Sequence, residues 1–239
     1  MSASVLRTKR KKRSKLLPAV CISAAVFFSA GIFISKALNS ISSLPDYNSA
    51  DTIATAEVPE NRFLILVNGK NKIPDGYSPE LTELSNGERV DSGIYPDLRK
   101  MFDDMRAEGI YPVVGEGYRT NAEQKRMLED KIRAFEREGY SHKKSEAMAK
   151  EWVAVPGTSE HELGLAADIN ADKEKSDNQD VYDWLYENAY RYGFILRYPS
   201  GKSAVTGIDY EPWHYRYVGE YAEEIHNSGL CLEEWLEEN

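Results

Sequence analysis

The sequence predicts an α+β domain with a small antiparallel sheet flanked by helices, preceded by one N-terminal transmembrane helix. Three observations predict this architecture. Short apolar runs typical of strands are scattered among segments with helical periodicity, and several connections between them are short. Residues 61–239 carry these patterns, and about 180 residues suit one domain with a sizeable core. Residues 16–35 contain no charged side chain, as a membrane-spanning helix requires.

The uncharged stretch at residues 16–35 lies between two lysines. At ~1.5 Å per residue, a helix of this length spans the ~30 Å hydrocarbon core of a bilayer. Because seven basic residues occupy the first fifteen positions, the positive-inside rule predicts a cytoplasmic head at 1–15 and a signal anchor at 16–36. We therefore expect a single-pass protein of the cell membrane with its folded domain on the extracellular side. The alternative is a cleavable signal peptide ending at Ala37, although its apolar region usually has about 7–15 residues.

The part of the chain after the predicted membrane helix is acidic. All 39 acidic residues but only 22 of the 30 basic residues follow Lys36, which gives this part a net charge of −17. Such a surface argues against nucleic acid as a partner, because phosphate binding needs basic residues. Residues 37–60 are small and polar, which predicts a flexible linker before the domain at 61–239. With Cys21 in the membrane helix, Cys231 is the only external thiol, so we expect no internal disulfide in the domain. We also expect the protein to be a monomer.

The first half of the domain contains two strand-like runs and three segments with helical spacing. Arg62–Val67 (RFLILV) precedes an Asn68-Gly69 turn and is predicted to be a strand. Tyr95–Glu108 has apolar residues at helical spacing and ends at Gly109, so it is predicted to be a helix. The next predicted elements are a strand and two helices, the first helix capped by Asn121: Tyr111–Gly115, Asn121–Glu138 and Ser141–Trp152.

The second half of the domain alternates short strand-like runs with helices. Apolar runs predict the strands and amphipathic runs predict the helices, with Gly193 marking the end of one helix. The predicted strands are Leu165–Ile169, Phe194–Tyr198 and Trp213–Val218. The predicted helices are Val181–Tyr192, Gly219–Asn227 and Leu232–Glu238.

Two of the four histidines stand in sequence contexts that favour a metal site. His161 stands in SEHELGLAADI, where Asp168 falls in an apolar run, and His214 stands in EPWHY. A buried carboxylate is costly unless it is paired or binds a metal. Taken alone, Asp168 would more often pair with an arginine or cap a turn, and a lone histidine would more often be structural. Two histidines and one aspartate together, however, supply three ligands for a catalytic zinc and leave its fourth position to water.

A general base is predicted beside this ligand set. Zinc lowers the pKa of bound water towards ~7 and polarises a carbonyl oxygen, so a group is needed to accept the proton. Glu211 precedes His214 by three residues and is the best candidate. A helical H-E-x-x-H zinc motif is excluded, because the His161-Glu162 pair has no histidine four residues further on.

These motifs resemble those of the VanY-type D-alanyl-D-alanine carboxypeptidases. SEHELGLAADI is similar to the family signature S-x-H-x-x-G-x-A-x-D, and EPWHYRYVG is similar to its second zinc segment, E-x-W-H. Similar segments extend over nearly the whole domain: LVNGKNKIPDGY, GYRTNAEQ, GFILRYP and TGIDYEPWH. The resemblance implies the compact α+β fold shared with VanX, bacterial endolysin peptidases and the hedgehog signalling domain. It also implies one zinc per chain, held by His161, Asp168 and His214, with Glu211 as base.

Four residues are candidates for substrate contacts. A carboxypeptidase must bind a free terminal carboxylate, and on an acidic domain this needs a local cation. Arg119 matches the family arginine that binds substrate or stabilises the oxyanion; alternatively it is a solvated turn residue or a partner of Glu116. Gln124, Ser159 and Tyr198 match family positions that contact the peptide. Their structural alternatives are a helix-surface glutamine, a turn-capping serine and a core tyrosine.

The resemblance implies a zinc D,D-carboxypeptidase that removes the C-terminal D-alanine from peptidoglycan stem peptides. One alternative is an L,D-carboxypeptidase that uses the same machinery on tetrapeptide stems. Another is a wall-binding module that keeps zinc but has lost catalysis, as the hedgehog relatives suggest can happen. The presence of Glu211 together with Arg119 favours an active enzyme over the binding module.

Overall fold

The computed structural model describes residues 54–55 and 61–239. The described residues all belong to one compact unit. The predicted basic head, the membrane helix and most of the linker therefore lie outside the described residues. Within the described part, no helix is long and apolar enough to cross a membrane. Of the linker, the structure describes only strand β1 (Ala54–Thr55), which pairs in parallel with strand β2 (Asn71–Lys72).

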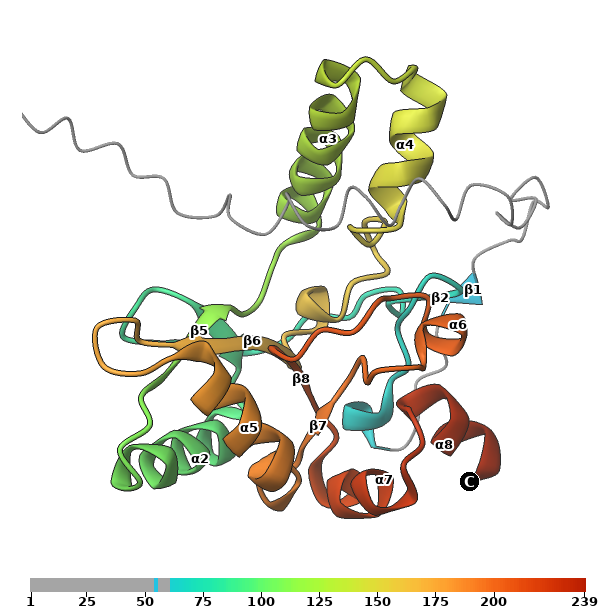
Figure 1. The fold of residues 1–239 in the computed structure, drawn as a ribbon. Coiled ribbons are helices and arrows are strands. Elements are labelled where there is room, and N and C mark those ends of the chain that lie inside the picture. The colour runs from blue at the N-terminus through green and yellow to red at the C-terminus, as the bar shows by residue number, and fades with distance from the viewer. Residues whose placement is uncertain (1–53, 56–60) are drawn as a thin grey trace, which may run out of the picture. The chain divides into compact units, whose positions relative to one another are not determined.

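The centre of the domain is a four-stranded antiparallel sheet (Figure 1). Its strands, in spatial order, are β5 (Pro112–Glu116), β6 (Ala166–Ala171), β8 (His214–Tyr217) and β7 (Phe194–Leu196). Every neighbouring pair in this order is antiparallel. The predicted small antiparallel sheet is therefore confirmed, and the ends of each strand fall within one or two residues of the predicted ones.

The two faces of the sheet have different surroundings. Side chains alternate along a strand, so Ile169 and Asp168 of β6 point to opposite faces. The face that carries Ile169 and Tyr215 belongs to the main hydrophobic core, together with helices α2 (Tyr95–Ala107) and α5 (Asn178–Asn188). Figure 1 shows both helices on the same side of the sheet. The other face carries Asp168, His214 and the buried Arg216.

The predicted helix at 95–108 forms as α2 because its apolar residues recur every three or four positions. Pro96 lies in the first turn, where the helix makes no use of the missing N–H. The helix ends before Gly109, whose φ of +84° is a left-handed conformation that suits glycine. The buried residues of α2 are the ones that define its periodicity: Leu98, Met101, Phe102 and Met105.

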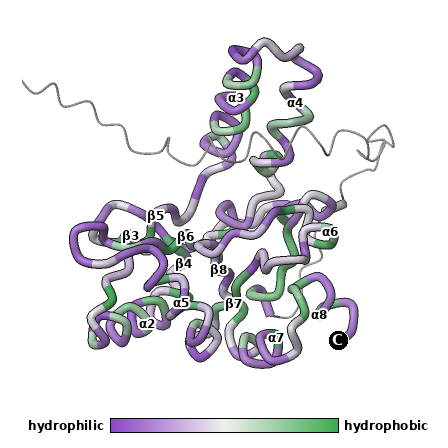
Figure 2. The backbone as a smooth tube through the Cα atoms, in the orientation of Figure 1, coloured by the Kyte–Doolittle hydropathy of each residue, from purple (hydrophilic) through white to green (hydrophobic). Residues whose placement is uncertain are grey.

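A helical hairpin projects from the sheet and its covering helices in Figure 1. It consists of α3 (Asn121–Arg137) and α4 (His142–Lys150), which pack against each other. The hairpin has a small hydrophobic core of its own, separate from the main core, formed by Leu128, Ala149 and Val153. In Figure 2 the hydrophobic colour on these helices lies mainly between them, and their outer sides are hydrophilic. We call residues 121–150 the hairpin below.

The N-cap of the hairpin differs from the prediction. Thr120, not Asn121, caps α3: its hydroxyl accepts the Glu123 N–H, and the Glu123 carboxylate accepts the Thr120 N–H. This reciprocal capping box satisfies two backbone donors at the helix start, which a cap by Asn121 would not do. The Asn121 side chain instead donates to Glu162, in the segment that leads to the sheet.

The C-terminal part of the domain forms a second, smaller hydrophobic core around Ile225 and Leu232. The helical segment predicted at 181–192 is divided into α5 and the 3-10 helix η3 (Ala189–Tyr192), and it ends at Gly193 as predicted. The described cysteine, Cys231, is a buried free thiol. The other helices of this C-terminal part are α6 (Ser203–Thr206), η4 (Gly219–Tyr221), α7 (Ala222–Ser228) and α8 (Leu232–Glu238).

The predicted strand at Arg62–Val67 is wrong. Its first residues, Arg62–Leu64, form the 3-10 helix η1, and the residues after η1 are not part of a strand. The run is apolar because Ile65 and Val67 are buried in the main core. Two of its backbone carbonyls accept hydrogen bonds from the Arg216 guanidinium instead of from a neighbouring strand. The apolar run therefore predicted correctly that this segment is buried. It did not predict that a side chain, and not a neighbouring strand, bonds to its backbone carbonyls.

The sequence did not predict the two-stranded antiparallel sheet that β3 (Leu81–Glu83) and β4 (Arg89–Asp91) form. These strands have three residues each, which is too short for a clear alternating pattern. The Asp91 N–H donates to the Gly164 carbonyl at 2.9 Å. The β3–β4 pair thus supports the turn that connects His161 to strand β6.

Candidate active site

One row of residues across the sheet carries part of the predicted zinc site. Asp168 of β6 lies opposite His214 of β8, and on its other side it lies opposite Glu116 of β5. Opposite residues on antiparallel strands share a face, so these side chains lie on the face away from the main core. His161 reaches the same place from the 3-10 helix η2 (Glu160–Leu163), which leads into β6.

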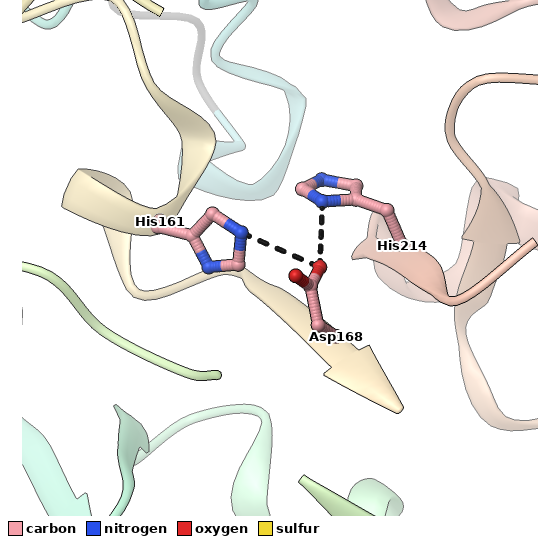
Figure 3. Close-up of side chains that lie close together, drawn as sticks. All are labelled: His161, Asp168 and His214. Atoms are coloured by element: carbon pink, nitrogen blue, oxygen red, sulfur yellow. Dashed lines mark hydrogen bonds and ion pairs between the residues drawn. The ribbon is translucent and has the colours of Figure 1, made fainter. Parts of the chain in front are cut away.

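The three predicted ligands point toward one another (Figure 3). Asp168 Oδ1 lies 3.0 Å from His214 Nδ1 and 3.4 Å from His161 Nε2. All three ligand atoms lie within 4.8 Å of one another. Donor atoms held about 2.0–2.2 Å from a single zinc ion are separated from each other by roughly 3–4 Å. Both the spacing and the choice of two imidazoles and one carboxylate therefore fit zinc.

Each ligand histidine has one ring nitrogen engaged by a protein oxygen and the other turned toward Asp168. His161 Nδ1 lies 2.8 Å from the Gly117 carbonyl, which can only accept, so this nitrogen carries the hydrogen and Nε2 is left to bind metal. In His214 the nitrogens are exchanged: Nε2 lies 3.4 Å from Glu160 Oε2, and Nδ1 faces Asp168. Histidines that bind metals commonly donate their second nitrogen in this way, which fixes the ring orientation.

The electrostatics of the site suit a cation. Burial disfavours a charged imidazole, but hydrogen bonds to Asp168 and Glu160 raise the pKa of His214 to about 9. Burial likewise disfavours a charged carboxylate, yet His161 and His214 hold the pKa of Asp168 well below its usual range. Because zinc ligands bind in their deprotonated form, we expect zinc binding to release protons.

Glu211 lies beside the ligands, just before strand β8. Its Oε2 atom is 3.8 Å from His214 Nδ1, and its side chain is 28% exposed. Backbone hydrogen bonds hold the segment: the Glu211 N–H donates to the Tyr198 carbonyl, and the His214 N–H donates to the Glu211 carbonyl. Burial raises the pKa of Glu211, although the charge of His214 opposes the shift. A partly shielded carboxylate at this position is suited to accept a proton.

Arg119 is buried near the ligands and is not a solvated turn residue. Its Nε donates to Glu116 at 2.8 Å, so the pairing that the sequence left open is present. A second guanidinium nitrogen donates to the side-chain oxygen of Gln124. The Arg119 backbone N–H donates to the His161 carbonyl at 3.1 Å, which places the arginine next to the ligand segment.

The other predicted substrate contacts lie around the same site. Gln124 is fully buried; it donates to the Ala154 carbonyl and accepts from Arg119, so it positions the arginine rather than lying on the helix surface. Ser159 stands at the N-cap of η2 but makes no side-chain capping bond, unlike the turn-capping alternative. The buried Tyr198 ring packs against His214, with 4.8 Å between ring centres. The structure thus brings the predicted site residues into one region.

Sequence reasoning missed four charged residues that are buried behind His214. Glu160 Oε1 accepts hydrogen bonds from two arginines, and one of these also binds a glutamate of α8. The available signal was an arginine inside each of two apolar strand segments, FILRY and HYRYV, since a charge on a buried strand needs a buried partner. We call these residues the buried charge cluster: Glu160, Arg197, Arg216 and Glu233.

Comparison with known protein sequences gives a family match. The family model described as VanY, D-alanyl-D-alanine carboxypeptidase, matches residues 87–220. This range includes the three predicted ligands, Glu211 and Arg119. A D-alanyl-D-alanine carboxypeptidase of Enterococcus faecalis (strain ATCC 700802 / V583) is 51% identical over 193 residues, which are 80% of this chain and 72% of that protein.

Solved structures of similar sequence have the same fold. VanYB in complex with D-alanine-D-alanine has a TM-score of 0.70 and 54% identity, over 73% of this chain and 97% of that chain. A VanY variant from a VanB-type resistance cassette, in complex with Zn(II), has a TM-score of 0.69 and 54% identity, over 72% and 98%. The LdcB LD-carboxypeptidase has a TM-score of 0.65 and 32% identity, over 79% and 95%. The predicted compact α+β fold of the domain is therefore confirmed.

Proposed function

We propose that this chain, which belongs to the VanY family of D-alanyl-D-alanine carboxypeptidases, is a zinc-dependent D,D-carboxypeptidase that acts on peptidoglycan stem peptides. The observation that carries this function is the convergence of His161, Asp168 and His214 on one point, with Glu211 beside them. The relatives supply the metal and the substrate class, since one VanY structure is a complex with Zn(II) and another a complex with D-alanine-D-alanine.

The ligand set and the base divide the chemistry between them. His161 Nε2, the Asp168 carboxylate and His214 Nδ1 would hold the zinc. When bound, zinc polarises the scissile carbonyl and lowers the pKa of water towards ~7. The Glu211 carboxylate accepts the proton of the attacking water and delivers it to the nitrogen of the departing D-alanine. Its partial burial beside His214 keeps the proton close to the reacting atoms.

Arg119 is the group best placed to hold the terminal carboxylate of the peptide. A guanidinium has five N–H groups, and the contacts with Glu116 and Gln124 leave some of them for a ligand. These two partners also fix the plane of the guanidinium, which makes a two-point contact with a carboxylate more favourable. Ser159 directly precedes the helix η2 that carries His161, and the Tyr198 ring packs against His214, so both are candidates for further contacts with the peptide.

Defined peptides with the full zinc-loaded chain test this function. We expect release of D-alanine from a pentapeptide ending in D-alanyl-D-alanine, and little release after amidation of its C-terminus, which removes the charge that Arg119 binds. A single methyl-bearing centre is worth only a few kcal/mol of discrimination, so slower cleavage of an L,D-linked tetrapeptide can accompany the main activity. Faster cleavage of the tetrapeptide would replace D,D with L,D activity, and equal cleavage of the amidated peptide would exclude a carboxypeptidase.

Substitution of the base distinguishes between the two hypotheses that the chain is an enzyme or a wall-binding module. Glu211→Gln keeps the size of the side chain but cannot accept the proton. We expect it to retain one zinc per chain by metal analysis while turnover falls by about 10²–10⁴-fold. Loss of zinc in this variant would make Glu211 a ligand instead of a base. Absence of turnover in the unsubstituted, zinc-loaded chain would favour the binding module.

We also propose that residues 16–36 anchor the chain in the cell membrane with the domain outside. The support is the uncharged stretch of 20 residues and the basic head that precedes it. Protease added to intact cells should then release the domain by cutting in residues 37–60 and leave the head inside. Recovery of a mature protein that begins at Leu38 would show a cleaved signal peptide instead.

A further inference from the structure

The buried charge cluster lies directly behind one of the ligand histidines. Glu160 is 1% exposed and the two arginines are fully buried, while Glu233 of α8 is 7% exposed. Glu160 comes from η2, Arg197 directly follows β7, Arg216 comes from β8 and Glu233 comes from α8. Two positive and two negative side chains leave the cluster without net charge. Buried charges persist only when paired, so each member depends on the others.

The two oxygens of Glu160 have different partners. Oε1 accepts from Arg197 Nε and from Arg216 Nη1, both at 2.8 Å. Oε2 is the oxygen that lies 3.4 Å from His214 Nε2. Because the arginines engage one oxygen and hold the carboxylate in place, the other oxygen is presented to the imidazole.

Both arginines are themselves held on their outer sides. Arg216 donates to the backbone carbonyls of Phe63 and Ile65 at 3.0 and 2.8 Å. Arg197 donates to both oxygens of Glu233, at 2.8 and 2.6 Å. The position of Glu160 is thus fixed from the segment after the linker and from the C-terminal helix, and neither of these contributes a zinc ligand.

We propose that Glu160 is a positioning residue for zinc: it holds the hydrogen of His214 on Nε2 and so leaves Nδ1 as the ligand atom. The inference deepens the proposed function, because it rests on zinc binding at His161, Asp168 and His214. A neutral imidazole carries one hydrogen, and an acceptor at one nitrogen decides which nitrogen is free for metal. Glu160 can only accept at this position, because a carboxylate paired with two guanidinium groups stays ionised and has no hydrogen to donate.

The variant Glu160→Gln tests this assignment because an amide has one acceptor and one donor end. The arginines require the amide oxygen on their side, which turns the NH2 group toward His214 Nε2. That nitrogen must then accept, the hydrogen moves to Nδ1, and the ligand atom is blocked; exchanging a carboxylate for an amide is known to impose the wrong tautomer in this way. We expect zinc affinity to fall by about 10–100-fold, the usual effect of losing such a partner.

The matched control is Glu233→Gln. It removes the same charge from the same cluster and also leaves an arginine with a weakened partner, but Glu233 has no contact with His214. Both variants should therefore lose stability to a similar degree. Only Glu160→Gln should change zinc affinity, and Glu233→Gln should bind zinc within about threefold of the unsubstituted chain. Equal zinc affinities in the two variants would overturn the proposal and leave Glu160 a purely structural residue.

A measurement on the unsubstituted full chain keeps the proposal testable even where Glu160→Gln does not fold. Nitrogen-15 NMR of the zinc-loaded histidine side chains should show opposite tautomers, with the hydrogen on Nδ1 in His161 and on Nε2 in His214. A hydrogen on Nδ1 of His214 would overturn the proposal. These readouts need no peptide, so failure to release D-alanine with the expected tautomers would reject the proposed function and leave this inference standing.

Discussion

The buried charge cluster and the hairpin use the same kinds of charged side chain under opposite conditions. In the cluster, arginines and glutamates are shielded from water and arranged around one carboxylate. On the hairpin, the pairs formed by its own lysines and arginines join residues three or four apart on helix surfaces, as in Lys150–Glu146, whose side chains are 40% and 42% exposed. The cluster joins segments that are distant in sequence, whereas the hairpin pairs join neighbours.

The difference shows that the setting of an ion pair decides what it does. An exposed pair gains little because water and salt already solvate and screen both charges. A buried pair gains more attraction but has lost its hydration, so its net contribution is small while the loss of one partner is severe. The buried cluster therefore fixes where Glu160 and His214 lie, and the hairpin pairs add only to local helix stability.

The largest effect should follow from removing one cation of the cluster. Arg197→Met leaves Glu233 and one side of Glu160 without their partner in a buried place. We expect the free energy of unfolding to fall by about 3–5 kcal/mol, measured by urea denaturation at fixed excess zinc. Lys150→Met, the same kind of change on the hairpin, is the control. A loss below about 1 kcal/mol for Arg197→Met would remove the contrast between the two regions.

The next largest difference between the two regions should follow from zinc removal, which should affect the zinc site and leave the hairpin unchanged. Zinc binds only the folded site, so at a free concentration about 100 times its Kd it contributes ~2.7 kcal/mol to stability. We expect a chelator to speed hydrogen exchange at the amides of β6 and β8, which carry Asp168 and His214. Exchange within the hairpin should stay the same, because α3 and α4 pack on their own core. Faster exchange in both regions would show that they open together.

A cavity in the hairpin core tests whether the hairpin opens independently of the central sheet. Leu128→Ala removes a buried side chain that packs with Ala149 and Val153. We expect local opening of α3 and α4 to become easier by about 2–3 kcal/mol, seen as faster amide exchange in residues 121–150. Amides of the central sheet serve as the internal reference. An equal increase in the sheet would show that the hairpin core is continuous with the main one.

The smallest effect is expected for an exposed pair. Lys150→Ala breaks the contact with Glu146 on the surface of α4. The change in unfolding free energy should be below about 0.5 kcal/mol, and it should vanish in high salt, where exposed charges are screened. Urea denaturation at low and high ionic strength measures both. A salt-independent loss above 1 kcal/mol would mean that the pair behaves as though it were buried.

The parts of the molecule that could be predicted from the sequence are those with periodic apolar residues or with clusters of chemically related side chains. The helix at 95–108 followed from its apolar spacing, and the four central strands followed from short apolar runs. The ligand set followed from chemical type, since two histidines and an aspartate near a glutamate have few uses together. Strand register then brought Asp168 opposite His214.

The parts that could not be predicted depend on contacts between distant segments. The run at 62–67 looks like a strand because it is buried, but its carbonyls are satisfied by Arg216, some 150 residues away in sequence. Glu160 adjoins a predicted ligand, yet its partners become visible only when β7, β8 and α8 are in place. The cap at Thr120 was missed because two adjacent residues both favour the cap position, and the glutamate three residues after Thr120 decides between them.

Because the hairpin has a core of its own, its helices can become longer or shorter without a change in the zinc site. Its tip, residues 138–141, lies at the far end from Arg119 and Gln124, and Gly139 has open space around it. Lengthening, shortening or replacing the outer turns therefore changes the outline of the enzyme without moving a ligand. Because exposed loop tips tolerate insertions, we expect a second protein inserted at this tip to leave the zinc site in place.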